Sequence, residues 1–259
     1  MRLTVDIGNT TIALAVVRKD KVLAVQRLDT AIKSDQLKLQ LAGVLRGFKR
    51  KYGSIENAII CSVVPQVVGA VKRVIKQELK AKVVVVGEDV KVPLINRYKN
   101  PRQVGQDRLV GAYAAMKLYG KPAIIIDLGT AITFDAVSRK GEYLGGIIVP
   151  GLRLSAESLF LKTALLPEIV IKAPRSIVGR TTQESILSGL FYGYGSMCRG
   201  VIDLVGKHIK GKPKVIMTGG HTQLMKKFIA RDIRVIDEHL VFKGLSLLLD
   251  SMPKVGKST

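Results

Sequence analysis

The segment 3–17, LTVDIGNTTIALAVV, decides the fold, because its pattern returns at 124–138 as IIIDLGTAITFDAVS. Each copy has an aliphatic, strand-like segment, an aspartate, a glycine turn and a second β-rich segment. Asp6 matches Asp127 and Gly8 matches Gly129, so the two copies lie about half a chain apart in the 259 residues. The repeat predicts two equivalent lobes whose acidic turns face each other across a cleft.

The rest of the sequence alternates between strand-like and helix-like segments. Apolar residues recur at helical spacing in 34–51, 66–79, 106–118, 152–161, 183–205 and 240–249. Further short aliphatic segments predict strands at 22–28, 58–62, 82–86, 143–149 and 215–217. Segment 91–104 has two prolines and no clear period, which predicts a loop. We therefore predict an α/β fold with mixed sheets flanked by helices, and two lobes at 1–118 and 119–259.

The composition is that of an ordinary globular protein, with 47% hydrophobic and 24% charged residues. No apolar run reaches the roughly 20 residues of a membrane helix, so we expect no membrane partner. The two cysteines, Cys61 and Cys198, form no CxxC motif, and this cysteine usage favours the reducing cytoplasm.

The charge is strongly positive, because 42 Lys and Arg outnumber 20 Asp and Glu to give +22. Such a field attracts anions, including nucleotides and nucleic acids. The lysines are dispersed and are not interleaved with aromatic residues, so we interpret them as a solvated surface and expect no nucleic acid partner. The end of the chain, VGKST at 255–259, resembles part of a P-loop but lacks the upstream glycine and the following helix.

The first hairpin turn offers the groups that bind a phosphate. Gly8 allows close approach of the backbone, while Asn9 and Thr10 add amide and hydroxyl donors. Asp6 is suited to hold a hydrated Mg²⁺. A single turn of this kind is also an ordinary β-turn, but two copies in matched contexts favour a phosphate site.

The duplicated hairpins resemble those of the superfamily of sugar kinases, heat-shock chaperones and actin, and VIMTGG at 215–220 resembles its adenosine-contacting segment. That resemblance implies a duplicated ribonuclease H-like fold with a nucleotide cleft between the lobes. Five motifs together resemble type III pantothenate kinases, and they are DIGNT (6–10), NPRQVGQDR (100–108), DLGTAITFD (127–135), GGIIVPG (145–151) and GRTTQESILSG (179–189). One departure is Gln106, where we expect a small residue, usually alanine.

The resemblance implies transfer of the γ-phosphoryl group of ATP to the primary hydroxyl of pantothenate, the first step toward coenzyme A. It implies Mg²⁺ and a monovalent cation, K⁺ or NH₄⁺, as cofactors, with Asp127 as the ligand of the monovalent cation and Asp107 as the proton acceptor. It also implies a homodimer. The ATP-binding residues it implies are Asp6, Ile7, Gly8, Asn9, Thr10, Thr11, Ile12, Ala13 and Thr130. The pantothenate-binding residues it implies are Tyr98, Gly105, Gln106, Asp107, Arg108 and, from the partner subunit, Thr182.

Physical chemistry supports a role for Asp107, which occupies the first turn of the helix predicted at 106–118. The helix dipole there favours the ionised carboxylate. Phosphoryl transfer has a loose transition state, so a base need only align the hydroxyl and accept its proton late. The competing interpretation is that Asp107 pairs with Arg102 or Arg108 and has no chemical role.

Two functions besides pantothenate phosphorylation stay open. One is a kinase of the same superfamily that acts on another small alcohol. The second is a nucleic-acid-associated regulator that resembles the Bvg accessory factor. The packing of one helix face also stays open, because the small residues Gly189 and Gly193, with Ser185 and Ser196 nearby, form a stripe typical of either a dimer seam or packing within one lobe.

Overall fold

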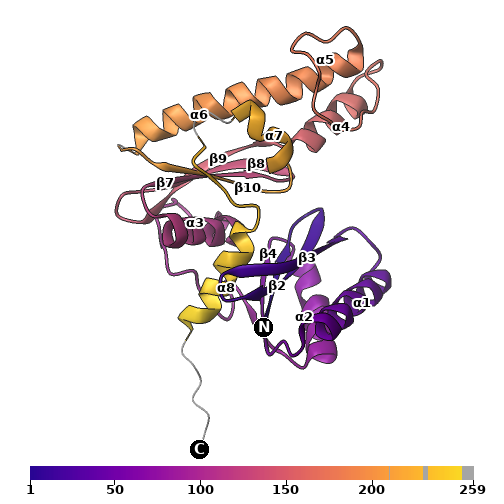
Figure 1. Cartoon of the computed structure of the whole chain (residues 1–259), viewed down its shortest axis with the longest axis vertical. Helices are drawn as coiled ribbons and strands as arrows, with labels where there is room; N and C mark the ends of the chain where they lie inside the picture. Colours follow the sequence, from indigo (N-terminus) through magenta and orange to yellow (C-terminus); the bar gives the residue numbers. More distant parts are fainter. Residues whose placement is uncertain (210, 230–232, 253–259) are drawn as a thin grey trace, which may run out of the picture. The chain divides into compact units, whose positions relative to one another are not determined.

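The computed structural model describes residues 1–209, 211–229 and 233–252, so the VGKST segment lies outside the described residues. The chain divides into two compact units (Figure 1). Unit 1 comprises Met1–Leu94, Asn100–Ala114 and the segment that begins at His239, and unit 2 comprises Ile95–Lys99 and Ala115–Glu238. This division differs from the single boundary predicted after residue 118, because the C-terminal helix belongs to unit 1 and residues 95–99 belong to unit 2.

Unit 1 is built on a five-stranded mixed sheet. Its order is β3 (Lys21–Asp29), β2 (Thr11–Arg18), β1 (Arg2–Ile7), β4 (Asn57–Ser62) and β5 (Lys82–Val85). The first three strands along the chain form an antiparallel meander, and β4 and β5 continue parallel to β1. Leu3, Val5 and Ile7 enter the main core of this unit, so Asp6 points to the opposite face of the sheet.

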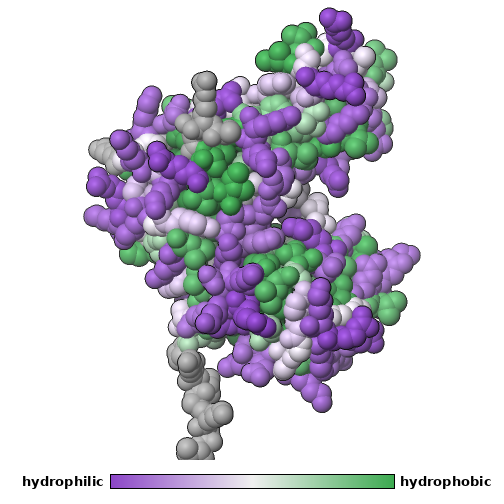
Figure 2. Space-filling model, in the orientation of Figure 1, coloured by the Kyte–Doolittle hydropathy of each residue, from purple (hydrophilic) through white to green (hydrophobic). Residues whose placement is uncertain are grey.

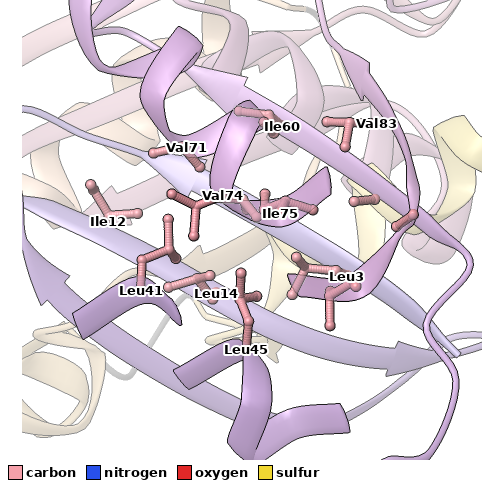
Figure 3. Packing of buried hydrophobic residues seen from close by; sticks show 14 of the residues in the cluster. Leu3, Ile12, Leu14, Leu41, Leu45, Ile60, Val71, Val74, Ile75 and Val83 are labelled. Atoms are coloured by element: carbon pink, nitrogen blue, oxygen red, sulfur yellow. The ribbon is translucent and has the colours of Figure 1, made fainter. Parts of the chain in front are cut away.

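Two layers of helix cover the sheet of unit 1. Helices α1 (Ser34–Tyr52) and α2 (Pro65–Leu79) cover one face, where their apolar stripes close the core (Figure 3). Helix α8 (Leu240–Ser251) lies on the other face, where Phe242 packs with Ala13, Ala15 and Val17. The sequence pattern predicts that α8 is amphipathic but does not say which sheet it covers, so the predicted boundary assigned it to the wrong lobe.

Unit 2 repeats the same topology. Its sheet has the order β11 (Val235–Ile236), β10 (Lys214–Thr218), β7 (Ala123–Leu128), β8 (Ala131–Val137), β9 (Glu142–Pro150) and β6 (Ile95–Asn96). Strands β7–β8–β9 form an antiparallel meander and β10 and β11 run parallel to β7, as β4 and β5 do to β1. The predicted duplication is therefore confirmed, with β6 as an added edge strand.

The core of unit 2 lies between the β7–β8 hairpin and helices α4 (Leu152–Lys162), α5 (Thr182–Ser188), α6 (Tyr194–His208) and α7 (Thr222–Ile229). Another helix, α3 (Gln106–Tyr119), begins in unit 1 and ends in unit 2. Among the described residues, no helix is both long enough and apolar enough to cross a membrane.

The structure differs from the prediction in several local features. The helix expected at 183–205 is interrupted by a π-helical turn at Gly189–Gly193. The helix α7 and the short strands β6 and β11 were not predicted. A Cβ atom built on Gly189 or Gly193 meets no atom within 4 Å apart from its neighbours along the same helix backbone. These two glycines are thus not used for close packing inside the unit, so that interpretation of the small-residue stripe was wrong.

Candidate functional site

The first acidic hairpin is a tight turn between β1 and β2. The Gly8 amide donates to the Thr11 carbonyl at 2.9 Å, and the Thr30 hydroxyl donates to the Gly8 carbonyl at 2.8 Å. Asn9 and Thr10 are exposed at its tip, whereas the side chains of Ile7, Ile12 and Ala13 are buried. Among the expected ATP-binding residues, the three buried ones can therefore offer a ligand only their backbone.

Two carboxylates of unit 1 gather around the thiol of Cys61. Asp6 and Cys61 are paired in register across β1 and β4, and both point away from the α1–α2 core. Cys61 is fully buried; burial raises its pKa well above the ordinary value, and the charges of Asp6 and Asp107 raise it further. The thiol is therefore neutral, and it lies near two acidic groups that are far apart in the sequence.

Asp107 stands in the first turn of α3, where its Oδ1 accepts the Arg108 backbone N–H at 2.8 Å. Burial raises the pKa of this carboxyl, and the backbone hydrogen bond and positive charge of Arg108 only partly oppose the shift. The helix terminus favours the ionised form of Asp107, but desolvation is the larger effect and sets the direction of the pKa shift. A carboxyl with a raised pKa is a better proton acceptor.

Gly105 lets the Asp107 carboxylate take this position. A Cβ atom at residue 105 would lie 2.4 Å from Asp107 Oδ1 and 3.5 Å from Val63 Cγ1. The carboxylate is thus folded back over the glycine, toward the end of β4. Any side chain at residue 105 displaces it.

The unusual Gln106 is accommodated by another glycine. Gly87, in the turn after β5, has a φ of +89°, and a Cβ atom there would lie 3.2 Å from Gln106 Cδ. The Gln106 side chain therefore lies against this turn. The larger side chain at position 106 fits because residue 87 is a glycine and has no side chain.

The second acidic hairpin, Asp127–Thr130, is enclosed by two glycines. A Cβ atom at Gly219, which has a φ of +97°, would lie 2.4 Å from Asp127 Oδ1 and 2.6 Å from the Leu128 nitrogen. On another side, the Gly151 amide donates to the Thr130 carbonyl at 3.0 Å. Thr130 itself is exposed and Asp127 is half-buried. The turn is thus held rigidly while the Thr130 residue is exposed.

Tyr98 and Thr182, two expected pantothenate contacts, belong to unit 2. The Tyr98 amide donates to Asn96 Oδ1 at 3.0 Å, and its ring covers Gly145, where a Cβ atom would lie 3.4 Å away. Thr182 is exposed at the start of α5, directly after the Thr181 cap. It borders an apolar pocket of about 400 Å³, whose other lining residues are Leu159, Leu166, Ser185, Ile186, Gly189 and Leu190.

Asp6 and residues 105–108 thus belong to unit 1, while Tyr98, Asp127, Thr130 and Thr182 belong to unit 2. Sequence reasoning missed the position of Cys61 near Asp6 and Asp107 and the close approach of Gly219 to Asp127. The sequence offered a signal for Gly219 only, because a glycine pair directly after a strand indicates a close backbone approach.

The aspartates of the two hairpins offer oxygen ligands to cations. In the described ranges, no three His, Cys, Asp or Glu side chains group as a metal site. Mg²⁺ in phosphoryl-transfer enzymes is commonly held by one or two carboxylates, with phosphate oxygens and water as its other ligands. The single carboxylate of Asp6, beside a phosphate-type turn, suits this kind of binding.

Solved structures with the same architecture share little sequence with this chain. A ROK-family glucokinase from Streptomyces griseus matches with a TM-score of 0.56 at 12% identity, covering 96% of this chain and 99% of the glucokinase. The ethanolamine utilization protein EutJ from Carboxydothermus hydrogenoformans matches with a TM-score of 0.55 at 16% identity, covering 95% of this chain and 89% of EutJ. These likenesses establish the actin-like, duplicated α/β fold.

Sequence relatives are far closer. The family profile described as "Type III pantothenate kinase" matches residues 2–204. A protein of that name from Persephonella marina is 40% identical over 249 residues, covering 95% of this chain and 96% of the relative. Another from Finegoldia magna is 36% identical over 253 residues, covering 96% of each. Since both the profile and these relatives extend over most of the sequence, the chain belongs to the type III pantothenate kinase family.

Proposed function

We propose that this protein transfers the γ-phosphoryl group of ATP to the primary hydroxyl of pantothenate, giving 4′-phosphopantothenate for coenzyme A synthesis, with Asp107 as the proton acceptor. Family membership supports the reaction. The observation that carries the role of Asp107 is its carboxylate, which is folded over Gly105 and has a pKa raised by burial.

Asp107 acts by aligning the substrate hydroxyl and by taking its proton late in the transfer. The attacked phosphoryl group is already close to metaphosphate in a loose transition state, so the alcohol needs little activation. A carboxylate with a raised pKa takes the proton more readily as the new P–O bond forms. The Arg108 amide holds Oδ1, which leaves the other carboxylate oxygen for the hydroxyl.

The cofactors are ATP, Mg²⁺ and a monovalent cation, K⁺ or NH₄⁺. The hairpin Asp6–Ala13 binds the ATP phosphates through its exposed tip and backbone, and Thr130 adds a hydroxyl contact. Asp127 ligates the monovalent cation. Bound cations neutralise the charge that develops on the transferred phosphoryl group.

The pantothenate contacts come from Tyr98, the segment Gly105–Arg108 and Thr182. Arginine is suited to a carboxylate, and pantothenate has one, so Arg108 is the residue of this set that pairs with it. We also propose a cytoplasmic location, as the cysteine usage predicts.

The protein acts as a homodimer through an apolar face of unit 2. Green, apolar residues gather around α4 and α5 in Figure 2. Leu161, Leu165, Val170, Ile177 and Val178 are each more than 60% exposed there. Exposed apolar residues that occur singly are normal, whereas a group of them marks an interaction surface. Because these residues adjoin Thr182, a second copy of the chain that covers them also approaches that residue.

The dimer is tested by Leu165→Asp, with Leu39→Asp as the matched control, because Leu39 is an exposed leucine on α1 of unit 1. Light scattering after size exclusion should give twice the chain mass for the unchanged protein and for the control, and a lower mass for Leu165→Asp. A monomer in all three samples would overturn the assignment.

The reaction is tested by measuring ADP release with ATP and Mg²⁺, with and without pantothenate and with K⁺, NH₄⁺ or Na⁺ as the monovalent ion. We expect turnover that requires pantothenate, rises with K⁺ or NH₄⁺ and is lost in Asp107→Asn. Turnover with another small alcohol in place of pantothenate would overturn the substrate. Near-full activity of Asp107→Asn would overturn its role as the base.

A further inference from the structure

Asp135 on β8 is a buried acidic residue that the proposed mechanism does not use, and only 3% of it is exposed. Its Oδ1 accepts a hydrogen bond from the hydroxyl of the fully buried Tyr143 at 2.7 Å. Its Oδ2 accepts a second hydrogen bond, from the Thr133 hydroxyl, at 3.3 Å. Since a buried charge contributes little net stability, its hydrogen bonds are better explained by what they position.

Strand pairing brings this network to the second acidic hairpin. Phe134 enters the core of unit 2, so its neighbours Thr133 and Asp135 point to the opposite face of the sheet. Asp127 points to that face as well, because Leu128 enters the core. Asp127 and Thr133 are directly opposite each other in the β7–β8 register. Such residues have Cβ atoms about 4.5–5.5 Å apart, so one small ligand can contact both side chains.

The hydrogen bond to Asp135 also fixes the direction of the Thr133 hydroxyl. An ionised carboxylate only accepts, so Thr133 gives its single proton to Asp135. The lone pairs of Thr133 Oγ1 are then left for other partners, and the residue is only half-buried. A hydroxyl oxygen whose proton is turned away is a ligand for a cation such as K⁺.

We propose that Thr133 Oγ1 is a further ligand of the monovalent cation at Asp127, and that Asp135 is the positioning residue that orients this hydroxyl. The inference rests on the proposed function, because the assignment of the cation to Asp127 is part of that function. Asp135 itself does not touch the cation. Its role is to keep the Thr133 proton away from it.

The test measures how K⁺ stabilises the protein and tightens ADP binding, with choline replacing K⁺ so that the ionic strength stays constant. Thermal unfolding over a series of K⁺ concentrations gives the half-maximal K⁺ concentration without turnover. Calorimetry with ADP and Mg²⁺ gives the same quantity from the nucleotide affinity. Urea unfolding checks that each variant is folded.

The first pair of variants tests the ligand. Thr133→Val keeps the shape of the side chain and removes its oxygen, whereas Thr133→Ser keeps the hydroxyl. The matched control is Thr4→Val, because Thr4 is a buried threonine on β1 of unit 1 whose hydroxyl donates to the Ala15 carbonyl at 3.3 Å. The control removes a strand hydroxyl far from Asp127 in the sequence and in the other unit.

We expect Thr133→Val to raise the half-maximal K⁺ concentration about tenfold, the effect of one lost contact with a charged partner. Thr133→Ser should stay within about threefold of the unchanged protein. Thr4→Val should lose stability and keep its K⁺ requirement. An unchanged K⁺ requirement in Thr133→Val would overturn the inference, as would a serine variant no better than the valine variant.

A third variant, Asp135→Asn, tests the positioning role. The Tyr143 hydroxyl still donates to the amide oxygen, so the amide nitrogen faces Thr133 and donates to its oxygen. The Thr133 proton then turns outward, where it opposes a cation. The half-maximal K⁺ concentration should therefore rise at least as much as in Thr133→Val, although Thr133 is unchanged. A K⁺ requirement equal to that of the unchanged protein would overturn the role of Asp135.

The failure of the inference and that of the proposed function are distinguishable. A protein that responds to K⁺ through Thr133 but turns over no pantothenate retains the inference and loses the proposed reaction. A protein whose pantothenate turnover is stimulated by K⁺ to the same degree in Thr133→Val retains the reaction and loses the inference. A protein that responds to no monovalent cation loses both the cation at Asp127 and the role of Thr133.

Discussion

The substitution Gly105→Ala changes the position of the Asp107 carboxylate and keeps its chemical identity. The new Cβ atom would lie 2.4 Å from Asp107 Oδ1, whereas ordinary van der Waals contact begins near 3.4 Å, so the oxygen must move by about 1 Å. The displaced atom is the end of a side chain and not backbone. The carboxylate therefore moves by rotation, at a cost of about 0.5–1.5 kcal/mol if it leaves its preferred rotamer.

Catalysis should suffer far more than stability. A displacement of about 1 Å in a positioned group lowers the rate by roughly a hundredfold, which corresponds to about 2.7 kcal/mol in the activation barrier. We therefore expect kcat of Gly105→Ala to fall about a hundredfold. Its free energy of unfolding should change by no more than about 1.5 kcal/mol.

The control is Gly111→Ala on the same helix, since a Cβ atom at residue 111 meets nothing within 4 Å. This variant should keep its activity and gain about 0.5–1 kcal/mol of stability, as alanine does in place of a helical glycine. ADP release and urea unfolding give both quantities for both variants. Gly105→Ala with kcat within about threefold of the unchanged protein would refute the assigned position of the carboxylate.

Buried titratable groups and one ion pair give three more expected outcomes. Asp107→Asn should reduce turnover by roughly a hundredfold or more. The same substitution should raise the free energy of unfolding near neutral pH, because a carboxyl whose pKa is raised on folding destabilises the native state when it is ionised. Urea titrations should show this increase in stability shrinking as the pH falls toward about 4. Cys61 and Cys198 should resist alkylation in the folded protein at about pH 8 and react in urea, because both thiols are buried. Burial raises the pKa of both thiols, that of Cys198 to about 12. Mass spectrometry that finds either cysteine alkylated in the native protein would contradict this burial. Arg2→Ala should lower the free energy of unfolding by about 1 kcal/mol, because the Arg2 guanidinium forms an ion pair with the partly exposed Asp250 carboxylate on α8. An unchanged midpoint of urea unfolding would show that this ion pair does not stabilise the fold.

The sequence was most informative where its periodicity was strong. The duplicated hairpins predicted both sheets, because a strand–Asp–Gly–strand pattern at two places determines the same local pairing twice. Helices α1 and α2 were predicted almost to the residue, since their buried positions follow the helical period without interruption. The π-helical turn at Gly189–Gly193 was not, because the apolar pattern on either side of it continues as in a regular helix.

The candidate site was predicted in its residues but not in its environment. The motif around Asp107 indicated a base, yet the sign of its pKa shift depends on how deeply folding buries the carboxyl. The same holds for the Gln106–Gly87 contact, which joins residues from separate segments. Weak or short elements such as β11 were missed, because two residues carry too little pattern to distinguish a strand from a loop.

Helix α8 gives the chain an order of assembly on the ribosome. Residues 115–238 contain nearly everything that unit 2 needs, so its sheet and helices can form as soon as they emerge. The first strands to be synthesised, β1 and β2, cannot bury one of their faces until α8 is made. Phe242 and the other α8 residues that cover this face come some 220 residues later in the chain. Until α8 is synthesised, the sheet of unit 1 therefore has one uncovered apolar face. A chain truncated before residue 240 would leave this face of its first strands exposed.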